Sequence, residues 1–83
     1  MSYSSELLEE IKLLSLYKLS STQEGIKVHK AAGSAAIAAA NRLYDKGLVT
    51  QADGGYLTNL GVEAAGHAQA LLSILAYMPG AVD

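Results

Sequence analysis

The sequence predicts a small, mainly α-helical domain that contains a single β-hairpin. Apolar residues recur at helical spacing in four segments of the 83-residue chain. The motif "ADGG" separates two short β-like runs, and small polar residues or glycines stand where helices would begin and end. The length corresponds to one domain, residues 1–83. A domain of this size buries only about 60–65% of its unfolded surface, so a lone monomer would be marginally stable.

The composition indicates a cytoplasmic protein. The chain has no cysteine, which excludes disulfides and thiolate metal sites and suits a reducing compartment. The N-terminus "MSYSSELLEEI" carries acids instead of the basic region of a secretory signal. The most apolar window, residues 64–78, is shorter than the roughly 20 residues that a membrane span needs. We therefore expect a soluble protein without membrane association.

The first helix is expected at about residues 5–17. Ser4 and Ser5 precede it, and either hydroxyl can accept a hydrogen bond from an amide of the first turn. A second helix is expected at about residues 22–30, because Ser21 and Glu24 have the spacing of a capping box.

The third helix is expected at about residues 34–46. Gly33 can end one helix and Ser34 can cap the next, while Gly47 stands where a left-handed residue would end the third helix. Taking 100° per residue, the face expected to turn inward holds Ala36, Ile37, Ala40, Leu43 and Tyr44. The opposite face holds Ser34, Ala35, Ala38, Asn41, Arg42, Asp45 and Lys46. Two helices joined through a short glycine-containing turn match a helix-turn-helix.

A β-hairpin is expected at about residues 48–58. The runs 48–51 and 56–58 are β-like, and "ADGG" between them offers residues that tolerate positive φ. A lone hairpin is unstable in water, so Leu48 and Leu57 are expected to pack on the helices.

The last helix is expected at about residues 59–78, with Thr58 or Asn59 as its N-cap and Pro79-Gly80 beyond its end. Its apolar arc is about 200° wide, whereas a surface helix needs roughly 100°. One edge can cover the core of its own chain, and the other edge would face water unless a partner covers it. We therefore expect a homodimer through this helix, with an interface at Ala68, Leu72, Leu75 and Ala76.

The motif "AANRLYDKGLVTQADGGYLTNLG" resembles a segment of MarR- and PadR-like winged helix-turn-helix regulators. In those proteins a recognition helix ends in a lysine- or arginine-glycine-leucine motif, a wing follows, and "L-T-x-x-G" opens the next helix. The segments "EGIKVHKAA", "RLYDKGLVTQADGGYLT" and "G-x-E-A-A-x-H-A" are also similar to a family of small bacterial proteins described only as DNA-binding, without an established function. The resemblance implies a winged helix-turn-helix fold, a recognition helix at residues 34–46 and a wing at residues 51–56.

The leading functional expectation is therefore binding of double-stranded DNA by a small homodimeric transcriptional regulator. The candidate DNA contacts are Lys27, Lys30, Ser34, Asn41, Arg42 and Lys46. Arg42 could recognise guanine and Asn41 adenine, although both lie past the first turn of the helix, which usually enters the groove most deeply. The wing "QADGGY" contains no cation, and Asp53 at its tip would repel phosphate.

The same residues leave a second interpretation open, in which a winged-helix module binds protein instead of DNA. Lys27 and Lys30 would then simply be solvated cations near a helix C-terminus. The net charge of −2 gives no general attraction to nucleic acid. His29 and His67 have no second metal ligand at helical spacing, and no motif for a nucleophile, for paired catalytic carboxylates or for phosphate binding is present. We therefore expect no enzyme activity, no metal and no cofactor.

Overall fold

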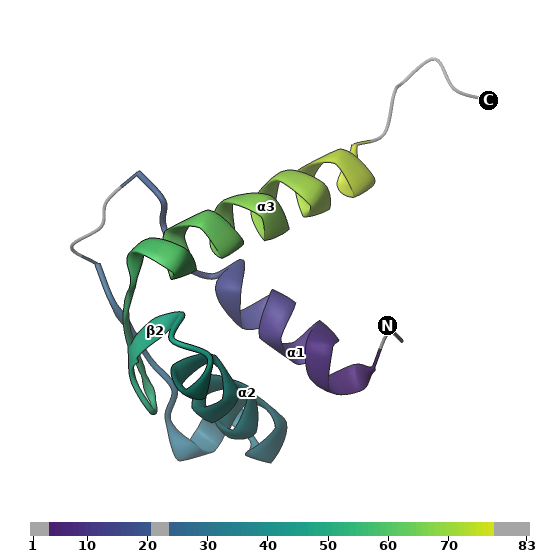
Figure 1. Ribbon diagram of the computed structural model, residues 1–83. Coiled ribbons are helices and arrows are strands. Elements are labelled where there is room, and N and C mark those ends of the chain that lie inside the picture. The colour runs from purple at the N-terminus through teal and green to yellow at the C-terminus, as the bar shows by residue number, and fades with distance from the viewer. Residues whose placement is uncertain (1–3, 21–23, 78–83) are drawn as a thin grey trace.

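The computed structural model describes residues 4–20 and 24–77 and is mainly helical, with a small antiparallel sheet (Figure 1). Along the chain its elements are α1 (Ser5–Leu14), β1 (Ile26–Lys27), the 3₁₀-helix η1 (Lys30–Ala32), α2 (Ser34–Asp45), β2 (Val49–Gln51), β3 (Gly54–Leu57) and α3 (Asn59–Ala76). The predicted combination of helices with a small β element is confirmed. The sheet nevertheless holds three strands, in the order β1-β3-β2, where the sequence predicts two.

Helix α1 begins as the sequence predicts and ends earlier. The Ser4 hydroxyl accepts a hydrogen bond from the Leu7 amide at 3.1 Å, which satisfies one of the free amides of the first turn. Ser15 follows the last residue of the helix, and the next two residues form turns through 3₁₀-type bonds, including the bond from the Tyr17 amide to the Leu14 carbonyl. These turns leave the Tyr17 side chain buried.

The helix predicted at residues 22–30 is wrong over its described part, where β1 and η1 form instead. Ile26 pairs with Gly55, and the Val28 amide donates to the Asp53 carbonyl at 2.8 Å, so the segment is held extended against the hairpin. Two β-branched residues and Gly25 give this segment a weak helix propensity, which the sheet overcomes. Ser21, half of the predicted capping box, lies outside the described residues.

Helix α2 ends in the way that Gly47 predicts. The φ angle of Gly47 is 78°, its amide donates to the Tyr44 carbonyl at 3.0 Å, and the Leu48 amide donates to the Leu43 carbonyl at 2.9 Å. These two bonds form a Schellman motif, which satisfies carbonyls at the helix end and turns the chain into β2. At the other end of α2, Ser34 is the first helical residue and makes no capping hydrogen bond; Gly33, with a φ angle of 99°, occupies the N-cap position.

The inward side of α2 contains Ala40 and Leu43 as predicted and differs from the predicted face at two positions. Ala39, which the sequence did not assign to the inner face, is fully buried with Ala40 and Leu43, whereas Tyr44 is 46% exposed. Two adjacent alanines let the backbone of α2 approach its neighbours closely, and a tyrosine at that face would hold them apart. The core lies where α1, α2, β2 and α3 meet.

The two glycines of "ADGG" lie in strand β3, and the turn itself consists of Ala52 and Asp53. Gly54 and Gly55 have φ angles of 122° and 74°, which favour glycine. A Cβ atom on Gly54 would collide with the Ile26 carbonyl oxygen of β1. The glycines therefore allow β3 to run between two neighbouring strands, instead of forming the predicted four-residue turn.

Helix α3 is anchored by its first half. The Thr58 hydroxyl accepts from the Gly61 amide at 3.0 Å and donates to the Gly47 carbonyl at 2.6 Å, so it caps α3 and joins it to the end of α2. The Gln69 amide group donates to the Tyr17 carbonyl at 2.7 Å. Beyond this point the yellow end of α3 in Figure 1 points away from α2 and the sheet. Pro79-Gly80 lies outside the described residues, and no described helix has the length and apolar character needed to cross a bilayer.

Candidate interaction surfaces

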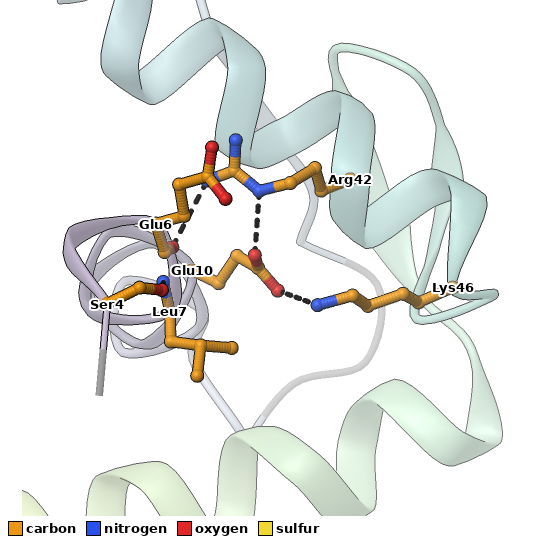
Figure 2. Close-up of polar contacts among 6 residues, drawn as sticks. All are labelled: Ser4, Glu6, Leu7, Glu10, Arg42 and Lys46. Atoms are coloured by element: carbon orange, nitrogen blue, oxygen red, sulfur yellow. Dashed lines mark hydrogen bonds and ion pairs between the residues drawn. The ribbon is translucent and has the colours of Figure 1, made fainter. Parts of the chain in front are cut away.

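An ion-pair cluster of three residues joins α1 to α2. Figure 2 shows the Glu10 carboxylate between two cations that extend from α2 and its C-cap. Arg42 Nε donates to Glu10 Oε2 at 2.7 Å, and Lys46 Nζ donates to Glu10 Oε1. A terminal nitrogen of Arg42 also donates to the Glu6 carbonyl at 3.1 Å. The cluster therefore fixes the crossing of the two helices by charge-assisted hydrogen bonds.

The cluster is largely withdrawn from solvent at its centre. Glu10 is only 5% exposed, while its two partners retain part of their contact with water. Burial raises the pKa of Glu10, and the hydrogen bonds and charges of Lys46 and Arg42 lower it by more, so that the pKa lies below its ordinary value. Glu10 is consequently ionised throughout the neutral range.

This arrangement alters the expected DNA-binding face of α2. The sequence places Arg42 and Lys46 on an open face, but the Arg42 side chain is 26% exposed and both cations are paired with Glu10. Glu10 is not among the site residues that the sequence predicts. Its signal is position: in "LLEEIKLL" this acid lies three and four residues before Leu13 and Leu14, and a carboxylate on an apolar helix face needs a cationic partner elsewhere in the chain.

The remaining DNA candidates, Lys27, Lys30, Ser34 and Asn41, are exposed. Within residues 4–20 and 24–77, neither Lys27 nor Lys30 forms an ion pair. Both precede the N-terminus of α2 and define what we call the basic segment, residues 27–30. The described part of the chain contains no group of three His, Asp or Glu side chains that could hold a metal ion.

A shallow hollow of about 330 Å³ lies between α1 and the outer side of α2. Its lining consists of Ser5, Glu6, Glu9, Ser34, Ala35, Ala38 and Arg42. Four of the residues that the sequence assigns to the outward face of α2 thus border two carboxylates of α1. A phosphate backbone laid along this side would approach those acids, which is electrostatically unfavourable.

The C-terminal part of α3 and its C-cap Tyr77, residues 70–77, form an exposed apolar surface that we call the α3 end. Its large apolar side chains are between 39% and 70% exposed; they are Leu71, Leu72, Ile74, Leu75 and Tyr77. Three of the four predicted interface residues, Leu72, Leu75 and Ala76, belong to this surface. The fourth, Ala68, is half-buried and packs against the core of its own chain.

A family model described as a family of unknown function (DUF5669) matches residues 1–76, and the chain therefore belongs to that family. No curated protein and no solved structure matches the chain.

Proposed function

We propose that this member of DUF5669 is a homodimeric protein-interaction module of the winged helix-turn-helix type. The order helix, strand, helical turn, helix and hairpin, with β3 between β1 and β2, supports this assignment. In such an arrangement η1 takes the place of the first helix of the helix-turn-helix, and α2 takes the place of the recognition helix. The three residues of η1 make this a reduced version of the motif.

The observation that carries the proposal is the exposure of the α3 end. Soluble monomers rarely expose a contiguous apolar surface of this kind, and larger patches usually mark an interface. The sequence from Ala68 to Tyr77 contains no charged residue, so it offers no cation to a nucleic-acid phosphate. A two-fold dimer is the commonest closed assembly that would cover such a surface.

Sedimentation equilibrium tests the dimer directly. At about 50 µM protein, a binding free energy more favourable than roughly −6 kcal/mol gives mostly dimers. A measured mass of 8.6 kDa, that of the monomer, would reject the proposal. Leu75→Glu should produce monomers that retain the helix content measured by circular dichroism. Leu60→Glu is the matched control, because Leu60 is an exposed leucine near the opposite end of the same helix, where an acid suits the helix dipole.

DNA binding by a transcriptional regulator is the second candidate, and the exposed basic segment beside α2 favours it. Lys27 and Lys30 are available to phosphates, and the exposed Asn41 offers an amide for a base edge. The pairing of Arg42 and Lys46 with Glu10, the acids near Arg42 and the absence of cations from the hairpin weigh against it. We therefore rank protein binding first.

Fluorescence anisotropy with a pool of random duplex DNA distinguishes the candidates. The slope of the logarithm of the binding constant against the logarithm of the salt concentration reports the number of phosphate contacts. If only Lys27 and Lys30 contact phosphate, this slope should be near −1.8 per protomer. If Arg42 and Lys46 also contact phosphate, it should be near −3.6. No detectable binding to duplex DNA at about 50 mM salt would leave the protein-interaction module as the function.

A further inference from the structure

An apolar groove runs between α1 and the segment that leads into α2. Two adjoining hollows of about 390 and 370 Å³ share Leu13, Leu16, Ala32 and Ala36 in their linings. Ala31 and the half-buried Ile26 and Val28 extend the second hollow. We call this surface the α1–η1 groove.

The groove exists because the chain places little bulk beside α1 at this point. η1 has only three residues, and alanines occupy the positions that border the groove on η1 and on the first turn of α2. Leu16, two residues past the end of α1, is consequently 65% exposed. Small side chains opposite large exposed ones form a surface suited to apolar side chains from outside.

The α3 end needs more cover than a second α3 end can provide. Residues 70–76 extend over about 10 Å, and apolar residues face several directions around this part of the helix. A helix that is apolar on all sides is normally buried on all sides. Packing two such short ends against each other covers only one side of each and leaves the other sides exposed, whereas a stable interface covers roughly 800 Å² per partner.

We propose that the α3 end of each protomer docks into the α1–η1 groove of a second copy of the chain. This inference rests on the homodimer proposed above and specifies its geometry. In a two-fold dimer the contact is reciprocal, so the same pairing of end and groove forms twice and covers both ends and both grooves. Lys27, His29 and the Lys12–Glu9 ion pair also line the groove, and the α3 end carries no charge that would oppose either sign there.

Cross-linking between two variants tests the contact, and the absence of native cysteine makes it specific. We would mix Ala32→Cys protein with Leu75→Cys protein, allow the protomers to exchange, and oxidise with oxidised glutathione. A disulfide requires Cα atoms about 4.4–6.8 Å apart. The expected product is a dimer that forms in the mixture and contains one chain of each variant. Ala35→Cys mixed with Leu75→Cys is the control, because Ala35 lies three residues from Ala32 but outside the groove.

A second variant pair decides the question without a disulfide. Ala32→Glu should weaken dimerisation at least tenfold in sedimentation equilibrium, because it would place a larger, charged side chain against the apolar α3 end of the partner. Ala35→Glu should leave dimerisation unchanged. Both alanines are exposed in the protomer, so neither substitution introduces a charge into its core.

The possible failures are distinguishable. A monomer for the unmodified protein would overturn both the homodimer and this inference. The second failure is a dimer in which Leu75→Cys protein cross-links to itself and which Ala32→Glu leaves intact. That result would support the homodimer and overturn the docking into the groove.

Discussion

Replacing Glu10 with glutamine is the sharpest test of what holds α1 against α2. The substitution preserves the shape of the side chain and removes its charge. The amide oxygen can still accept from one cation, but the amide nitrogen is a donor and cannot accept from the other. Breaking a fully buried ion pair by removing one partner costs about 3–5 kcal/mol. Arg42 and Lys46 are partly exposed and regain some hydration, so we expect a loss of about 2–3 kcal/mol in the free energy of unfolding.

A loss of that size is large for this chain. At about 0.05–0.15 kcal/mol per residue, a domain of 83 residues has a stability of roughly 4–12 kcal/mol. Urea unfolding at pH 7, followed by circular dichroism at one protein concentration, measures the change. Glu9→Gln is the matched control, because Glu9 contacts the exposed Lys12 at 3.3 Å and should contribute less than about 0.5 kcal/mol. Equal effects of the two substitutions would refute the argument that burial makes the Glu10 cluster stabilising.

Three further predictions concern Glu10, Gly61 and Thr58. The pKa of Glu10 is lowered in the folded state, so its contribution to stability is present above the unfolded-state pKa and is lost as the pH falls through the folded pKa. The free energy of unfolding should therefore depend less on acid pH in Glu10→Gln than in the unmodified protein. Gly61→Ala should lower the free energy of unfolding by about 1–3 kcal/mol, because its Cβ would collide with the Leu48 carbonyl oxygen. Gly66→Ala, in open surroundings on the same helix, should raise the free energy of unfolding by up to about 1 kcal/mol. Thermal unfolding compares the two variants. Thr58→Val should cost about 0.5–2 kcal/mol in urea unfolding, since it removes the N-cap of α3 and the bond to Gly47, and an unchanged midpoint would contradict that role.

Three of the helix ends were predictable because their signals are local. The capping bonds at Ser4, Gly47 and Thr58 each join groups within five residues, so a short stretch of sequence contains the information required for the cap. The same holds for the long apolar arc of the last helix, which predicted an exposed surface. Only the position of Ala68 differs, because Ala68 is needed by the core of its own chain.

The errors arose where partners distant in the sequence decide the structure. Strand β1 forms because Ile26 pairs with Gly55, and no local pattern reveals that pairing. The same pairing explains why residues 54 and 55 are glycines. The sequence predicted that they form a turn, whereas they permit close contact between β3 and the strands on both sides. Arg42 and Lys46 were assigned to an open face because the helical period shows direction but not which neighbouring helix covers that direction.

The position of Glu10 also determines how a DNA experiment must be designed. Arg42→Ala would remove a guanidinium from DNA and at the same time leave the buried Glu10 carboxylate with one cation fewer, so a loss of affinity could reflect a less stable fold. Lys27 and Lys30 make no ion pair within the described residues, and their side chains do not support the core. Lys27→Gln combined with Lys30→Gln should therefore leave the unfolding midpoint unchanged. Under the DNA interpretation this double variant should remove the salt dependence of binding, whereas a salt slope that persists would assign the phosphate contacts to other cations.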